Sequence, residues 1–156
     1  MNPRDMFNEY VIPALNDFEQ DPTSLHRAVS ALINIDALAE HVCQERGAPD
    51  SAAQFRNQLK GRCIELAYAW DVHDIHKHGT LTRRTPVLPN GRRPEVVWVG
   101  GAFQPNVFQH DAFQVGKPEV HLTLQDQSTR SALEVARIGA AWWDQELSYL
   151  GWLKSE

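Results

Sequence analysis

The stretch that decides the fold is Trp70-Asp71-Val72-His73-Asp74-Ile75-His76-Lys77-His78-Gly79, which closes a predicted helix. Ser51 is suited to cap the start of that helix, and Gly79 is suited to its left-handed end. Apolar side chains line two sides of its second half, which is typical of a central, buried helix. We therefore predict a helix over 51–78, with Gly61 as a point where it bends. The two apolar stripes are Leu59, Cys63, Leu66 and Trp70, and Ile64, Tyr68, Val72 and Ile75.

Three more helices are predicted around this one. The first covers 4–20, and Pro13 should kink or divide it because proline lacks the backbone N–H of a helix interior. The second covers 25–45 and has the most continuous apolar face. The last begins at Ser128 or Thr129, ends near Leu150, and should bury these residues: Leu133, Val135, Ile138, Ala141, Trp142 and Leu147.

Between the central and the last helix the pattern changes from helical to strand-like. Runs rich in β-branched residues occur at 95–99 and 120–124, with a further short strand expected within 106–115. Thirty residues are too few for an independent sheet domain, so we predict a strand-rich insertion at about 94–125. The sequence thus predicts one mainly α domain over 1–156: a four- or five-helix up-down bundle with a small antiparallel β insertion before the last helix.

Composition favours an ordinary folded protein. The chain has 156 residues, of which 42% are hydrophobic and 22% charged, a balance too apolar for disorder. Its first residues lack the order of a secretion signal, and no apolar run approaches the roughly 18 residues that a membrane span needs. We expect a cytoplasmic protein without a membrane partner. The two cysteines have neither zinc-site nor redox spacing, so we expect buried thiols.

Asp71, Asp74 and His78 are the candidate catalytic residues, because helical spacing places them along one edge of the central helix. Carboxylate and imidazole groups are ligands for zinc, iron, nickel or manganese, so the same three residues are candidate metal ligands. The helix at 25–45 could add Asp36, Glu40 or His41. The structural alternative is that the last turn, with its cationic and donor side chains, caps the helix and Asp74 holds His78.

A basic segment follows the central helix. The chain carries five cations and no acid between Asp74 and Glu95, so this segment is +5 while the rest of the chain is −10. Such a segment offers an anionic partner a local binding surface that the global charge of −5 hides. The alternative is a solvated loop. The candidate polyanion-binding residues are Lys77, Arg83, Arg84, Arg92 and Arg93.

The order of these parts resembles the bacterial helical-bundle proteins grouped as HEPN-like, whose functions are largely uncharacterised. The resemblance covers about the first 85 residues and the last helix. It is carried by Arg4 to Phe18, by Leu25-His26-Arg27-Ala28 through Ala39-Glu40-His41, and by Trp70-Asp71-Val72 through Lys77-His78-Gly79-Thr80-Leu81-Thr82. The third match is the best, because such sequences tend to carry an acid, a Lys-His pair and a leucine at the positions of Asp71, Lys77-His78 and Leu81.

Active HEPN ribonucleases carry an arginine four to six residues before a histidine. This chain departs from that pattern, because Arg62 precedes His73 by eleven positions and Trp70 stands where relatives have arginine. We therefore predict a non-catalytic or weakly catalytic HEPN-like accessory or binding module, for RNA or another polyanion through the basic segment, that forms a homodimer, with no cofactor expected. The alternative is a metal-dependent hydrolase or nuclease that uses a divalent metal at Asp71, Asp74 and His78.

Overall fold

The computed structural model describes residues 1–47, 49–81, 85–100 and 116–152. The chain begins with α1 (Pro3–Met6), a π-helical stretch (Phe7–Val11) and α2 (Ile12–Gln20). Pro13 has no N–H to bond the carbonyl group four residues earlier, and the N–H of Ile12 instead reaches back five residues to Phe7. The predicted interruption is thus a local widening of the helix ahead of the proline.

Helix α3 (Leu25–Glu45) has the bounds that the sequence predicts. The Ser24 hydroxyl accepts a hydrogen bond from the backbone N–H of Arg27 and caps its start. Because the helix is 21 residues long with a buried stripe along its length, it forms the spine against which the other helices pack.

The single helix predicted over 51–78 is wrong, because the chain forms two helices there. Helix α4 (Ala52–Lys60) starts with a complete capping box between Ser51 and Gln54. It ends at Gly61, and α5 (Ile64–His78) starts after Cys63, whose backbone is extended. The separation lets α4 and α5 each pack on α3 in its own direction. The predicted left-handed end at Gly79 is confirmed, with φ of 74°.

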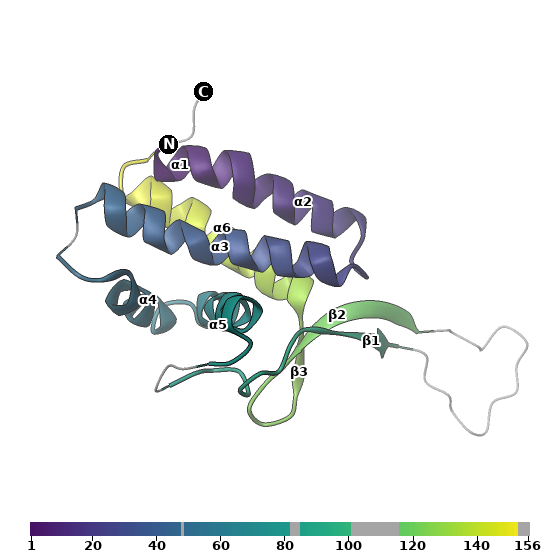
Figure 1. The fold of residues 1–156 in the computed structure, drawn as a ribbon. Coiled ribbons are helices and arrows are strands. Elements are labelled where there is room, and N and C mark those ends of the chain that lie inside the picture. Colours follow the sequence, from purple (N-terminus) through teal and green to yellow (C-terminus); the bar gives the residue numbers. More distant parts are fainter. Residues whose placement is uncertain (48, 82–84, 101–115, 153–156) are drawn as a thin grey trace, which may run out of the picture.

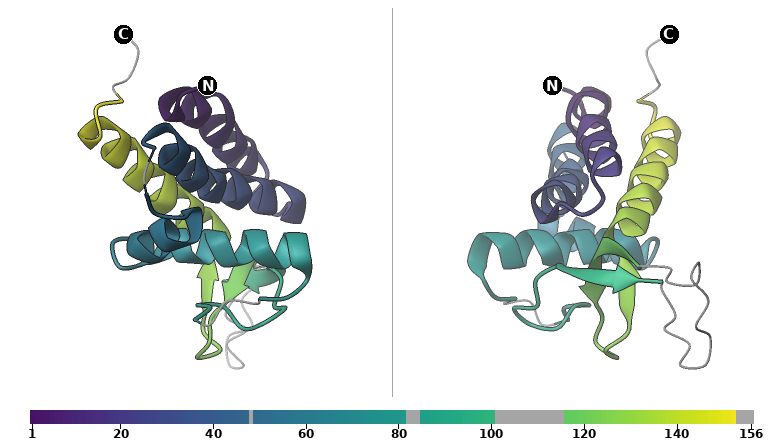
Figure 2. Two further views of the ribbon diagram at one scale, coloured as in Figure 1. Left: turned by 60° about the vertical axis from the view of Figure 1, so that its left-hand side comes forward. Right: turned by 90° about the vertical axis from the view of Figure 1, so that its right-hand side faces the viewer.

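Helices α2, α3 and α6 (Ala132–Tyr149) lie side by side, and α5 crosses beneath them (Figure 1, Figure 2). The sheet lies on the far side of α5 and α6 from α1 and α2. The predicted class, mainly α with a small antiparallel sheet before the last helix, is confirmed.

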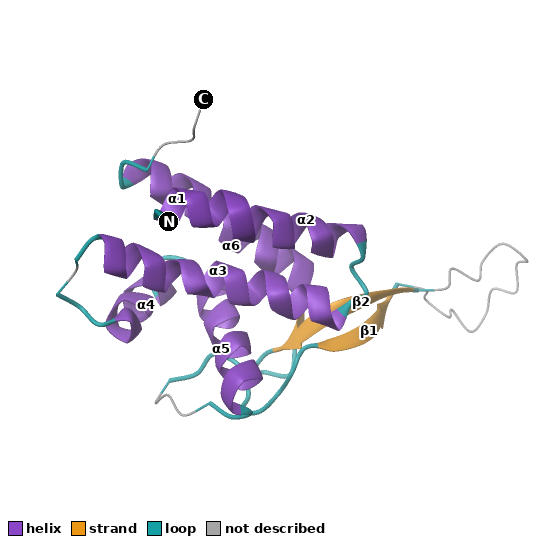
Figure 3. Cartoon of the chain, turned by 45° about the horizontal axis from the view of Figure 1, so that its top comes forward, coloured by secondary structure: helices purple, strands orange, loops and turns teal. Residues whose placement is uncertain are grey.

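In the described ranges, the strands of this sheet follow the order β1 (Glu95–Val99), β2 (Lys117–Thr123) and β3 (Thr129–Ser131). Both pairings are antiparallel, and Val97 lies opposite Glu119 in the first. The strand expected within 106–115 lies outside the described residues. The β1–β2 hairpin extends away from the helices (Figure 3).

The predicted start of the last helix at Ser128 or Thr129 is wrong. Thr129 pairs with Thr123 in the sheet, and the Ser131 hydroxyl caps α6 by accepting from the N–H of Glu134. A β-branched residue that has a cross-strand partner favours the strand over the helix. The strand-rich part of the chain therefore extends to Ser131, beyond the predicted boundary near 125.

Trp143 is the buried tryptophan of α6 with no exposed surface, whereas Trp142 is only partly buried. The indole N–H of Trp143 donates to the carbonyl oxygen of Ile35 at 3.1 Å, so its polar atom is satisfied inside the core. Of the residues predicted to be buried here, Ile138 and Ala141 are exposed. Among the described residues, the helices are too short or too polar to cross a bilayer.

Candidate functional site

Asp71 is fully buried on α5 and holds the loop that follows this helix. Its Oδ2 accepts hydrogen bonds from the backbone N–H groups of Val87 at 2.7 Å and Leu88 at 2.8 Å. Leu88 is also buried, so the acid and an apolar side chain pin the same point of the loop to the helix. Hydrogen bonds to an ionised acceptor are the stronger kind, and burial shields these from water. The carboxylate therefore has a structural role.

Further hydrogen bonds close the loop over residues 79–94. The Asn90 side chain accepts from the backbone N–H of Leu81 at 2.6 Å, which joins the two ends of the loop. Gly79 and Gly91 lie so close that a Cβ added to Gly91 would be 3.6 Å from the carbonyl oxygen of Gly79. The loop thus returns to the end of α5, where Lys77 lies.

Neighbouring elements hold the loop from two other sides. Lys60, the last residue of α4, donates to the carbonyl oxygen of Thr85 at 3.0 Å. Gln125, after β2, donates to the carbonyl oxygen of Leu88 at 3.0 Å. We call the described residues 77–81 and 85–93, which are the end of α5 and the loop after it, the basic loop. Lys60 was not among the predicted residues, because the sequence predicted one helix through this position, whereas α4 ends at Lys60.

The predicted polyanion-binding residues that the structure describes are all exposed: Lys77, Arg92 and Arg93. Arg92 pairs with Glu95 at 2.7 Å, so one cation of this set is partly neutralised. The side chains in that pair are each about half exposed, which makes the pair weak and easily exchanged for another anion. Arg83 and Arg84 lie outside the described residues.

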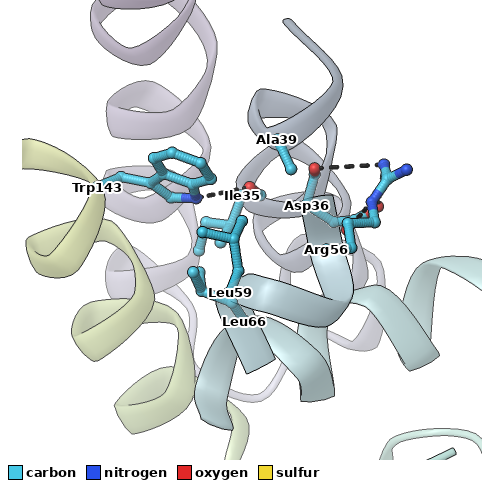
Figure 4. Close-up of a pocket in the computed structure, with 7 residues that line it drawn as sticks. All are labelled: Ile35, Asp36, Ala39, Arg56, Leu59, Leu66 and Trp143. Atoms are coloured by element: carbon cyan, nitrogen blue, oxygen red, sulfur yellow. Dashed lines mark hydrogen bonds and ion pairs between the residues drawn. The ribbon is translucent and has the colours of Figure 1, made fainter. Parts of the chain in front are cut away.

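A second polar cluster joins α3, α4 and α5 (Figure 4), and its centre is Asp36. The Asp36 side chain is 2% exposed, and its carboxylate accepts two hydrogen bonds from Arg56. The donors are Nε at 2.8 Å and Nη2 at 2.9 Å. Nδ1 of His73 lies 2.7 Å from Oδ2 of the same carboxylate. The Arg56 guanidinium also lies over the ring of Trp70, 5.6 Å from its centre. A buried acid is thus matched by two basic groups from two other helices.

Asp74 is adjacent to this cluster. Burial raises the pKa of the Asp74 carboxyl above its ordinary value, and the nearby Asp36 carboxylate raises it further; His73, Arg56 and His78 act in the opposite direction. The charge of His78 thus acts on Asp74, whereas Asp71 bonds the basic loop.

The three candidate metal ligands do not converge. Asp71 is engaged with the amides of Val87 and Leu88, and His78 is exposed at the end of α5. Throughout the described parts of the chain, no three histidine, cysteine or acidic side chains are grouped so that they could hold a metal ion. The sequence missed Arg56 as the partner of Asp36; the available signal was an acid on the apolar face of α3, which needs a partner when buried.

A pocket lies beside the Asp36–Arg56 pair, lined also by Ile35, Leu59 and Trp143 (Figure 4). Its cavity volume is about 10 Å³, room for about one water molecule. This pocket is too small for a substrate. Elsewhere, burial raises the pKa of the Cys63 thiol to about 11, so that cysteine is not a thiolate nucleophile at neutral pH.

Comparisons of the chain with protein-family models, curated proteins and solved structures found no match.

Proposed function

We propose that this protein is a non-catalytic binding module for RNA or another polyanion, and that the basic loop is its contact surface. The observation that carries the proposal is the closure of that loop, which returns Arg92 and Arg93 toward Lys77 at the end of α5. Cations gathered on one surface raise the local potential, whereas the same charges spread along a flexible segment act weakly.

The anchoring of the loop supports a binding role over a solvated loop. Asp71, Asn90, Lys60 and Gln125 each hold a backbone group of the loop, and Leu88 is buried beneath it. A segment held in this way loses little conformational entropy when a ligand binds. The resemblance to HEPN-like proteins, which include ribonucleases, makes RNA the polyanion to test first.

The experiment is a titration of the full chain into a fluorescently labelled single-stranded RNA over a series of salt concentrations. We expect log affinity to fall linearly with log salt, because cations that contact phosphates displace counterions. For a single strand the slope falls by about 0.7 for each cation removed. The triple variant Lys77→Gln, Arg92→Gln and Arg93→Gln should weaken binding by at least about tenfold at low salt.

A matched control is the triple variant Arg46→Gln, Lys117→Gln and Arg137→Gln, three exposed cations on other elements. It removes the same charge, so it should bind almost as the wild type does if position matters. Equal losses in both triple variants would leave only a general charge effect and reject the basic loop. No binding at low salt would reject the proposed function altogether.

A further inference from the structure

Among the residues that the structure describes, strand β1 is one edge of the sheet, because only β2 pairs with it in the order β1-β2-β3. Its sequence is Glu95-Val96-Val97-Trp98-Val99, and three of its apolar side chains are exposed: Val96 to 42%, Trp98 to 67% and Val99 to 39%. Alternate residues of an edge strand turn their N–H and C=O groups outward. The edge therefore combines backbone hydrogen-bonding capacity with exposed apolar surface.

Within the described part of the chain, this edge lacks the features that prevent pairing in monomeric proteins. Such proteins place lysine, proline or a bulge in an edge strand, or cover it. Strand β1 has none of these residues, its ladder with β2 is regular over all five positions, and its only charge is Glu95 at one end. The other edge, β3, is three residues long and is followed directly by α6.

We propose that β1 pairs with β1 of a second copy of this chain, antiparallel and about a twofold axis at Val97. This register places Val97 opposite the partner's Val97 and, on the face shared with Val120, Val96 opposite the partner's Trp98. Glu95 then lies opposite the partner's Val99, so no like charges meet. Apolar pairs across strands stabilise a sheet, and like charges directly opposite destabilise it.

The charges in and near β1 favour antiparallel pairing and favour a second copy of this chain as the partner. A parallel pairing would place Arg92 and Arg93 next to the same residues of the second copy, whereas antiparallel pairing separates the two basic loops by the length of the strand. The strand has no cation to attract an acidic segment and only one acid to attract a basic one, so an identical apolar edge is its best complement. Because β3 is short, the six-stranded sheet is closed to further copies.

The test measures the mass of the full chain in solution by light scattering during size-exclusion chromatography. We expect twice the 17.7 kDa of one chain. The variant Trp98→Lys should halve the measured mass, while Tyr149→Lys, an aromatic residue 84% exposed on α6, should leave it unchanged. Circular dichroism checks that both variants keep the helical content of the wild type.

Cysteine cross-linking tests the register. Residues opposite each other in a sheet have Cβ atoms about 5 Å apart, so Val97→Cys should form an intermolecular disulfide under mild oxidation. Val99→Cys should not, because the two copies of that residue lie about 13 Å apart at 3.3 Å per residue. The native Cys43 and Cys63 are buried, so the wild type gives the background. A monomeric wild type, a dimer that survives Trp98→Lys, or efficient cross-linking of Val99→Cys would each overturn the proposal.

Discussion

The Oδ2 atom of Asp71 lies 2.8 Å from the backbone nitrogen of Leu88, seventeen residues later, and both residues are buried. This relationship joins the acid on α5 to the loop that follows the helix. It also connects the interior of α5 with the exposed cations, because the loop that Asp71 holds is the one that carries them.

Asp71→Asn should lower the free energy of unfolding by about 2 kcal/mol, because two charge-assisted hydrogen bonds become neutral ones in a buried place. Urea denaturation monitored by circular dichroism measures this. Asp50→Asn, at an exposed acid, should change stability by less than about 0.5 kcal/mol.

The variant Asp71→Asn also tests whether RNA binding depends on the anchored position of the basic loop or only on net charge. Asp71→Asn removes a negative charge, so electrostatics alone would tighten binding to a polyanion. We expect weaker binding instead, because the loop loses its anchor. An unchanged or higher affinity would show that the anchored shape of the loop does not matter.

Arg56→Met should lower the free energy of unfolding by about 3 kcal/mol, because it leaves the Asp36 carboxylate buried with His73 as its remaining basic neighbour. The double variant Asp36→Leu and Arg56→Met should recover part of that loss, since no buried charge is left. The comparison is Arg137→Met, which breaks the pair with Glu19, whose two side chains are 57% and 36% exposed. Its cost should be about 1 kcal/mol or less. Equal costs for the two arginines would mean that burial does not set the strength of the Asp36 cluster.

Asp74→Asn should stabilise the protein at neutral pH. The pKa of Asp74 is raised in the folded state, chiefly by burial and then by Asp36, so the folded state holds its proton more tightly than the unfolded state. Stability from this group is therefore highest below the ordinary pKa of 3.8 and falls as the pH rises through the folded-state pKa. Urea midpoints should be higher for the variant at pH 7 and equal to wild type near pH 3. A variant less stable than wild type at pH 7 would show that the ionised carboxylate is favourable there.

Gly79→Ala should cost about 1 kcal/mol, because Gly79 ends α5 with φ of 74° and alanine is strained in that region. Open space surrounds its Cβ position, so the loss would come from backbone conformation and not from a clash. Thermal unfolding measures the effect. Gly61→Ala is the control, since Gly61 has a right-handed helical backbone; a loss there as large as at Gly79 would contradict the conformational explanation.

The bounds of α3 were predictable because its signals are local: Ser24 caps it, its apolar residues follow a helical period, and a glycine comes soon after its end. The break at Gly61 was not predictable with the same certainty, since the residues from Ser51 to His78 all fit one helical pattern. What divides them is packing: Leu59 and Cys63 are both buried, and the chain changes direction between them.

The candidate site was likewise predictable only in part from the sequence. Sequence spacing placed Asp71, Asp74 and His78 on one edge of a helix, but it could not say which neighbours the edge would meet. The backbone N–H groups of Val87 and Leu88 donate hydrogen bonds to Asp71. The packing of α3 places Asp36 beside His73 and close to Asp74. The exposure of Lys77, Arg92 and Arg93 followed from the sequence, because isolated cations stay in water unless they are paired.

The sequence by itself determined the helical class, the limits of α3, the left-handed end at Gly79 and the charge of the basic loop. These features depend on neighbouring residues, through caps, periodicity and backbone preference. Only the tertiary structure decided that Asp71 anchors a loop, that Arg56 pairs with Asp36 and that β1 is an edge of the sheet in the described part of the chain. Each of these depends on which distant segments come together, and that is set by burial of the whole apolar surface at once.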